Sequence, residues 1–222
     1  MKRVFNLLVV DESGSMSIIE HQALVGINET LTTIQKMQKT HKDMEQRVTF
    51  ITFDSTHKNL FYDNVSAHHI KPLKSRDYNP CGGTPLYDAI GMGIAKINAL
   101  TTEGDSVLVT IITDGEENCS EEYDLKMIKN LIEKLKKQNW TFTFIGTDDL
   151  DVENIAHGMG IDNHLQFQKM RLAPRRCLQE KTEPESATIS AVRWIARWKR
   201  AVILRRNKGS QYKQRITCKR VN

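Results

Sequence analysis

Short apolar runs alternate with longer segments of helical periodicity through the first 168 residues of this chain. Residues 4–10 and 107–112 are nearly all apolar, which is typical of strands buried on both faces of a parallel sheet. Between such runs, hydrophobic residues recur at the spacing of helices that bury one face. The expected strands span 4–10, 47–53, 60–62, 107–112, 140–145 and 164–167, and the expected helices span 17–39, 85–100, 120–138 and 152–159. This alternation predicts an α/β fold with a doubly wound, mostly parallel central sheet and helices on both faces.

One strand pair departs from this alternation. Only residues 54–59 separate the expected strands at 47–53 and 60–62, and this connection is too short for a crossover helix. We therefore expect these two strands to form an antiparallel hairpin at an edge of the sheet.

The charge of the chain is divided sharply along its length. The 222 residues carry a formal net charge of +5. Residues 1–168 hold 16 Lys and Arg against 24 Asp and Glu, a net charge of −8, whereas residues 169–222 hold 16 against 3, a net charge of +13. We therefore predict a domain at 1–168 and a basic C-terminal tail at 169–222.

The cysteines and the hydropathy indicate the compartment. Cys81, Cys119, Cys177 and Cys218 lie far apart and form no C-x-x-C pair, as expected for reduced thiols. No apolar run approaches the ~20 residues that span a bilayer, and the short N-terminal run ends quickly at an acidic residue. These features predict a cytoplasmic protein.

Three polar segments follow or precede expected elements at the places where an open α/β sheet binds ligands. Residues 11–15 follow the first strand with the pattern D-x-S-x-S, residues 82–85 read GGTP just before a helix, and residues 113–115 follow the most apolar strand. Their carboxylates and hydroxyls are hard oxygen donors, which suit Mg²⁺ or Mn²⁺ and not zinc or copper. The expected metal ligands are Asp11, Ser13, Ser15, Thr84 and Asp114.

Acidic residues flank these segments. We interpret Glu12, Glu116 and Glu117 as solvated charges at the rim of the site that tune its field. Asp88 lies one turn into the helix after Thr84 and is expected to stabilise the start of that helix through its dipole.

The motifs DESGSMS, GGTPLYDAI and TDGEEN, in this order, resemble the von Willebrand factor type A domain with its metal-ion-dependent adhesion site. The resemblance covers residues 1–168, and the wording of the motifs is similar to that of bacterial intracellular members. It implies that the two serines bind the ion directly, the threonine binds it directly or through water, and the aspartates act largely through water. It further implies a protein-interaction module without catalytic activity, in which an Asp or Glu of a partner protein completes the coordination. The partners implied are AAA+ ATPases or stress-response complexes, with no small-molecule substrate.

Two other functions remain open from the residues alone. A haloacid-dehalogenase-like phosphohydrolase also combines Mg²⁺, a threonine loop and acidic strand ends, but its first motif needs an aspartate where Ser13 stands, and no lysine accompanies Thr84. The tail offers the other function, because residues 186–206 can be drawn as a basic amphipathic helix with tryptophans, suited to nucleic acid or an anionic membrane. The composition of the tail favours a disordered solubilising segment or a frame-shifted sequence over such a binding role, and a segment packed on the domain is the third alternative.

Overall fold

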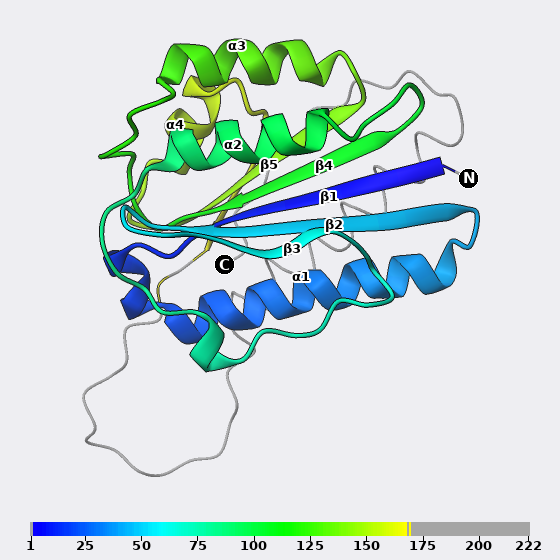
Figure 1. The fold of residues 1–222 in the computed structure, drawn as a ribbon. Helices are drawn as coiled ribbons and strands as arrows, with labels where there is room; N and C mark the ends of the chain where they lie inside the picture. Colours follow the sequence, from blue (N-terminus) through cyan, green and yellow to red (C-terminus); the bar gives the residue numbers. More distant parts are fainter. Residues whose placement is uncertain (1, 168, 170–222) are drawn as a thin grey trace.

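The computed structural model describes residues 2–167 and residue 169, and within this part of the chain a six-stranded sheet forms the centre. Its strand order is β3-β2-β1-β4-β5-β6, and every neighbouring pair is parallel except β2 and β3 (Figure 1). The strands are β1 (Lys2–Asp11), β2 (Met44–Phe53), β3 (Lys58–Ser66), β4 (Ser106–Ile112), β5 (Trp140–Thr147) and β6 (Asn163–Phe167). The predicted mostly parallel sheet with one antiparallel edge strand is confirmed.

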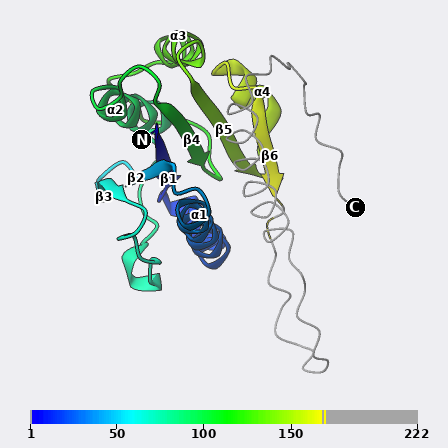
Figure 2. The same cartoon turned by 90° about the vertical axis from the view of Figure 1, so that its right-hand side faces the viewer.

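Helices cover both faces of the sheet, as predicted. Helix α1 lies on one face, and α2, α3 and α4 lie on the other (Figure 2). The helices are α1 (Glu20–Thr40), α2 (Leu86–Asn98), α3 (Leu125–Lys136) and α4 (Val152–Gly158), with short 3-10 turns η1 (Gly14–Ile18) and η2 (Ser75–Asp77). None of the helices in the described part of the chain has the length and apolarity needed to cross a membrane.

Strand β1 is buried on both faces of the sheet, which explains its almost continuously apolar sequence. Leu7 and Val9 pack in the hydrophobic core under α2 and α3, while Leu8 and Val10 pack in the core under α1. Successive side chains of a strand point to opposite faces, so a strand with helices on both sides needs apolar residues at every position. Because β1 lies between β2 and β4, its carboxyl end is held on both sides.

Several elements differ from their expected bounds. Helix α1 begins at Glu20 because residues 14–18 form a 3-10 turn, and β3 extends well beyond the expected 60–62 because it pairs along most of β2. Helix α3 begins at Leu125 and not near residue 120, since the preceding residues form a hydrogen-bonded loop. The expected tail helix at 186–206 lies outside the described residues.

Candidate metal centre

The three polar segments meet at the carboxyl ends of β1 and β4. These strands are parallel neighbours, with Val10 paired to Ile112, so the residues that follow them lie side by side. The loop before α2 joins them, because the N–H of Gly14 donates to the carbonyl of Gly82 over 3.0 Å. The fold thus brings together three segments that are distant in the sequence.

Hydrogen bonds connect four of the predicted ligands. The Oγ atoms of Ser13 and Ser15 lie 3.1 Å apart, and Ser15 Oγ donates to Asp114 Oδ1 over 2.7 Å. Asp11 lies beneath this group, fully buried. Its Oδ1 accepts the backbone N–H of Ser13 over 2.7 Å, and its Oδ2 accepts the Thr113 hydroxyl over 2.6 Å. Both oxygens of Asp11 are therefore held in place.

Gly115 marks the space that these groups enclose. A β-carbon on Gly115 would lie 3.2 Å from Thr84 Oγ1, 3.5 Å from Ser15 Oγ and 3.8 Å from Asp11 Oδ2. Oxygen atoms from two of the segments thus surround one point beside this glycine, which belongs to the third segment. The site opens to solvent on the side of Ser15, which is exposed, while the other predicted ligands are buried.

The separations of these oxygens suit a small dication. Magnesium takes six oxygens at ~2.1 Å, which places adjacent ligand atoms about 3 Å apart. The distances from Ser15 Oγ to Ser13 Oγ and to Asp114 Oδ1 are close to that spacing. The residues present therefore fit a hard divalent cation.

The carboxylates of Asp11 and Asp114 are buried, so water stabilises their negative charges poorly. Burial raises the pKa of Asp11 to about 6, and the neighbouring Asp114 carboxylate adds to the rise, although hydrogen bonds from Thr113 and Ser13 oppose it. Oδ2 of Asp114 is buried and accepts no well-aligned hydrogen bond within the described residues. Two adjacent buried carboxylates of this kind favour a nearby cation.

Lys169 supplies one positive charge to the site. Its ammonium nitrogen lies 3.1 Å from Asp114 Oδ2 and 2.7 Å from Asp149 Oδ2. Burial alone would lower the pKa of Lys169, but the ion pairs with Asp149 and Asp114 outweigh it and raise the pKa above its ordinary value. The sequence offered no signal for this contact, since Lys169 opens the segment assigned to the basic tail; residues 170–222 lie outside the described structure.

The interpretation of the flanking glutamates as solvated charges is wrong for two of the three. Glu12 is only 3% exposed and accepts the backbone N–H of Asn79 over 2.5 Å. Glu117 accepts hydrogen bonds from four donors: the backbone N–H groups of Tyr87, Cys119 and Ser120 and the hydroxyl of Ser120. Both carboxylates build the loops around the site, because these loops have no strand or helix to satisfy their N–H groups. Glu116 is exposed, as expected.

Comparison with known protein families identifies the fold. The profile of the von Willebrand factor type A domain matches residues 7–173, three quarters of the chain. The chain belongs to the von Willebrand factor type A domain family. Among curated proteins, none matches the sequence.

Solved structures share this type A fold at low sequence identity. The vWF domain of the type V pili tip protein Mfa5 from Porphyromonas gingivalis has a TM-score of 0.62 and 11% identity, over 96% of this chain and 98% of that one. The pilus adhesin SpaC from Lactobacillus rhamnosus GG has a TM-score of 0.60 and 16% identity, over 91% of this chain and 30% of that one. Proximal thread matrix protein 1 from the mussel byssus has a TM-score of 0.56 and 14% identity, over 91% of this chain and 46% of that one. The chain therefore spans less than half the length of the last two proteins.

Two residues that sequence reasoning missed support the site of this type A domain. Tyr78 is buried, and its hydroxyl donates to the carbonyl of Asp11 over 2.6 Å. Asn118 Oδ1 accepts the backbone N–H of Thr84 over 2.8 Å, and its own N–H donates to the Thr84 carbonyl over 3.2 Å. Both lie in irregular segments, where no periodic pattern indicates which side chains contact the site.

Proposed function

We propose that this type A domain is a protein-interaction module that captures an acidic side chain of a partner at a Mg²⁺ or Mn²⁺ ion. The ion would occupy a metal-ion-dependent adhesion site formed by Asp11, Ser13, Ser15, Thr84 and Asp114. The observation that carries the proposal is the space beside Gly115, which is surrounded by oxygens of Thr84, Ser15 and Asp11.

Each residue has a distinct part in this proposal. The hydroxyls of Ser13, Ser15 and Thr84 are neutral donors, so they leave the positive charge of a dication available to an incoming carboxylate. The carboxylates of Asp11 and Asp114 balance that charge within the protein. When bound, the ion supplies Lewis acidity toward the carboxylate of the partner.

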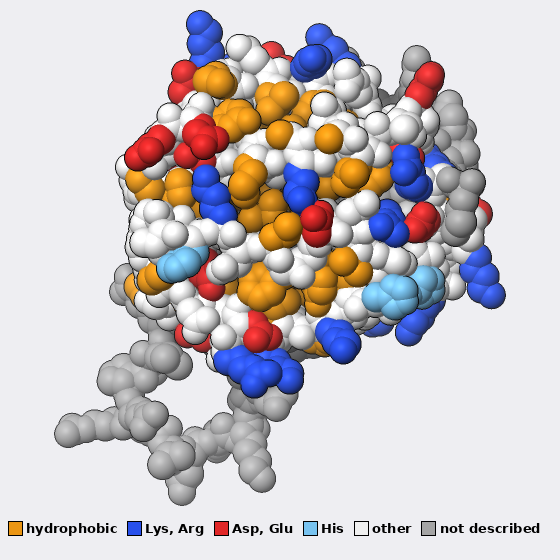
Figure 3. Space-filling model, in the orientation of Figure 1, with side chains coloured by type: hydrophobic (Ala, Val, Ile, Leu, Met, Phe, Trp, Pro, Cys, Tyr) orange, Lys and Arg blue, Asp and Glu red, His pale blue; other side chains and the backbone are white. Residues whose placement is uncertain are grey.

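The surroundings of the site suit docking of a protein. Ser15 is exposed at the surface, and Ile18 in the same 3-10 turn is 67% exposed. An exposed apolar side chain beside a charged anchor point is a feature of protein interfaces. On the face that carries β3, charged side chains of both signs lie among hydrophobic ones (Figure 3).

We propose further that the module acts without catalysis. A phosphohydrolase of the alternative type needs the carboxylate after the first strand as an accessible nucleophile. Asp11 is fully buried and both of its oxygens accept hydrogen bonds, which favours a positioning role. The resemblance of the motifs to bacterial intracellular members supports a cytoplasmic setting, with an AAA+ ATPase or a stress-response complex as the partner.

A melting-temperature titration with Mg²⁺, Mn²⁺ and chelator tests the metal site. A cation that binds only the folded chain stabilises it by about 2.7 kcal/mol at a hundredfold excess over Kd. We expect both metals to raise the melting temperature of the native chain and to have no effect on Asp114→Ala. Asp43→Ala, at an exposed position on the loop before β2, is the matched control and should respond like the native chain. A native chain that shows no metal response, or a partner that stays bound in chelator, contradicts the proposal.

Lys169→Met is expected to raise the affinity for Mg²⁺ by about tenfold, equivalent to ~1.4 kcal/mol. The ammonium of Lys169 contacts Asp114 Oδ2 and repels a dication placed nearby, so its removal favours the metal. The same change should lower the stability of the metal-free chain, because Asp114 and Asp149 lose their cation.

Isothermal titration calorimetry with Mg²⁺ measures this change in affinity. Lys136→Met is the control, since Lys136 pairs with Asp162 at the surface and not with the site. Unchanged or weaker Mg²⁺ binding by Lys169→Met would show that Lys169 does not compete with the ion.

A further inference from the structure

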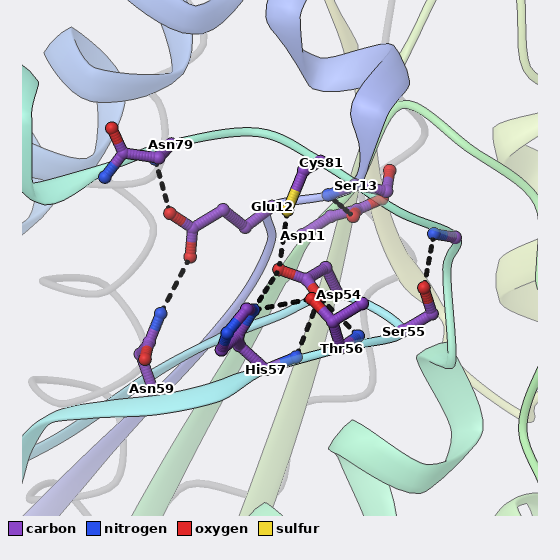
Figure 4. Close-up of polar contacts among 11 residues, drawn as sticks. Asp11, Glu12, Ser13, Asp54, Ser55, Thr56, His57, Asn59, Asn79 and Cys81 are labelled. Atoms are coloured by element: carbon purple, nitrogen blue, oxygen red, sulfur yellow. Dashed lines mark hydrogen bonds and ion pairs between the residues drawn. The ribbon is translucent and has the colours of Figure 1, made fainter.

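Three side chains with different metal-binding atoms meet beside the candidate metal centre, on the turn between β2 and β3 (Figure 4). Asp54 follows β2, His57 precedes β3, and Cys81 lies in the loop before α2. Cys81 Sγ lies 3.4 Å from Asp54 Oδ2, and His57 Nδ1 lies 3.7 Å from the same oxygen. All three atoms lie within 4.8 Å of one another.

The turn itself orients the carboxylate of Asp54. The N–H of Asp54 donates to the His57 carbonyl over 2.9 Å and closes the turn. Oδ1 of Asp54 accepts the N–H and the hydroxyl of Thr56 over 2.5 and 2.6 Å, and the N–H of His57 over 2.8 Å. These three bonds occupy Oδ1, so that Oδ2 faces Cys81 and His57.

Backbone contacts hold Cys81 in place independently of its thiol. The N–H of Cys81 donates to the Glu12 carbonyl over 2.8 Å, and the N–H of Gly83 donates to Ser55 Oγ over 2.8 Å. Gly82 packs so closely on the turn that a β-carbon there would lie 2.5 Å from Ser55 Oγ. The two loops are therefore held together before any ion binds.

The distances match the edges of a tetrahedral site. Zinc binds oxygen and nitrogen at ~2.0 Å and thiolate sulfur at ~2.3 Å, which separates ligand atoms by about 3.3–3.6 Å. The observed 3.4 and 3.7 Å lie close to that range. Sulfur and imidazole ligands select zinc-class cations, in contrast to the all-oxygen donors around Gly115.

We propose that Asp54, His57 and Cys81 form a second metal site, for a thiophilic divalent cation such as Zn²⁺. Asp54 is buried, whereas Cys81 and His57 are exposed, so the cation enters from solvent and the fourth coordination position is open to water or to a partner. Binding replaces two contacts of the metal-free protein: the thiol of Cys81 on Asp54, and the 2.5 Å contact between His57 Nδ1 and Thr56 Oγ1. The thiol proton leaves to solvent as the thiolate forms.

The second site links to the candidate metal centre through one short loop. Cys81 directly precedes Gly82, whose carbonyl accepts the N–H of Gly14, and the same loop carries Thr84. A cation on Cys81 therefore ties the turn between β2 and β3 to the loop that supplies a hydroxyl to the first site.

Titration of the reduced, metal-free full chain with Co²⁺ tests the proposal. We expect one thiolate-bound Co²⁺ per chain, with a thiolate-to-cobalt charge-transfer band in the near ultraviolet and visible bands of tetrahedral intensity. Adding Zn²⁺ should abolish these bands. The band should be lost in Cys81→Ser and in His57→Gln. It should persist in the matched control, a triple variant with Ser at Cys119, Cys177 and Cys218.

The spectra also separate the two metal sites, because the site beside Gly115 contains no sulfur. Asp114→Ala is expected to lose its response to Mg²⁺ and to keep the cobalt band. Cys81→Ser and His57→Gln change exposed side chains. An unchanged circular dichroism spectrum and an unchanged melting temperature without metal establish that both variants fold. Absence of the band from the native chain, or a band that persists in Cys81→Ser and disappears in the triple variant, overturns the second site and leaves the first untouched.

Discussion

Replacing Gly115 by alanine is expected to abolish Mg²⁺ binding while the domain remains folded. The added β-carbon would lie 3.2 Å from Thr84 Oγ1 and 3.5 Å from Ser15 Oγ, within the space that the oxygens enclose. A carbon atom there excludes an ion that needs oxygen contacts at ~2.1 Å, so we expect the affinity to fall at least ~100-fold. Gly115 has no positive φ, so alanine adopts its backbone conformation, and a crowded methyl group costs about 1–3 kcal/mol of stability.

Calorimetric titration with Mg²⁺ and the melting temperature in chelator measure the two effects separately. Gly158→Ala is the matched control, because a β-carbon at Gly158 meets no atom within 4 Å. It should bind Mg²⁺ like the native chain. If Gly115→Ala binds Mg²⁺ with native affinity, the ion does not lie beside this glycine.

Asp88→Ala is expected to lower the free energy of unfolding by at least ~3 kcal/mol. Each hydrogen bond to a charged group contributes ~1.5–3 kcal/mol, and the three lost here share one carboxylate, so their contributions do not simply add. The carboxylate of Asp88 is 5% exposed and accepts the backbone N–H groups of Glu121, Glu122 and Tyr123 over 2.9–3.0 Å. The expectation that Asp88 acts on the helix dipole is therefore incomplete: it lies in the first turn of α2, but it binds the loop before α3.

The pH dependence of this effect has a definite sign. Burial alone would raise the pKa of Asp88, but the three backbone N–H donors outweigh it and hold the pKa below its ordinary value. The stabilisation is therefore complete above the ordinary aspartate pKa of ~4 and is lost as the pH falls through the lowered pKa. The difference in stability between the native chain and Asp88→Ala should be largest near neutral pH and should shrink in acid.

Urea unfolding at several pH values measures this difference. Glu122→Ala, at an exposed position in the same loop, is the control and should change stability little. A small loss at neutral pH would mean that the loop finds other acceptors, and a difference that grows in acid would contradict the assigned pKa.

The sheet could be predicted because its signals are local. The apolar run of β1 reflects burial on both faces, and the short connection between β2 and β3 excludes a crossover, so both the parallel centre and the antiparallel edge follow from residues near one another in the chain. Element bounds were less accurate where tertiary contacts set them. Helix α3 starts at Leu125 because side chains accept the N–H groups of the residues before it. Asp88 of α2 accepts the N–H of Glu121, and Glu117, earlier in the same loop, accepts the N–H of Ser120.

The residues of the candidate metal centre were also predictable as a set, since each follows a strand or precedes a helix at the edge where parallel strands end. Oxygens of Thr84, Ser15 and Asp11 surround Gly115, and the role of the five residues as metal ligands stays a prediction. The cluster of Asp54, His57 and Cys81 was not predictable, because Cys81 lies far from the other two in the chain and no spacing rule connects them.

The order of strands and helices, the antiparallel edge and the chemical character of the three polar segments all follow from the amino-acid sequence, because periodicity, loop length and donor type are local properties of a chain. Which charges are buried, and what they contact, depends on the folded arrangement of the chain. Glu12 and Glu117 became loop anchors, and Lys169 became the cation beside Asp114. Burial and hydrogen bonding of a polar side chain depend on segments that folding brings close to it. The sequence around that residue does not indicate which distant segments these are.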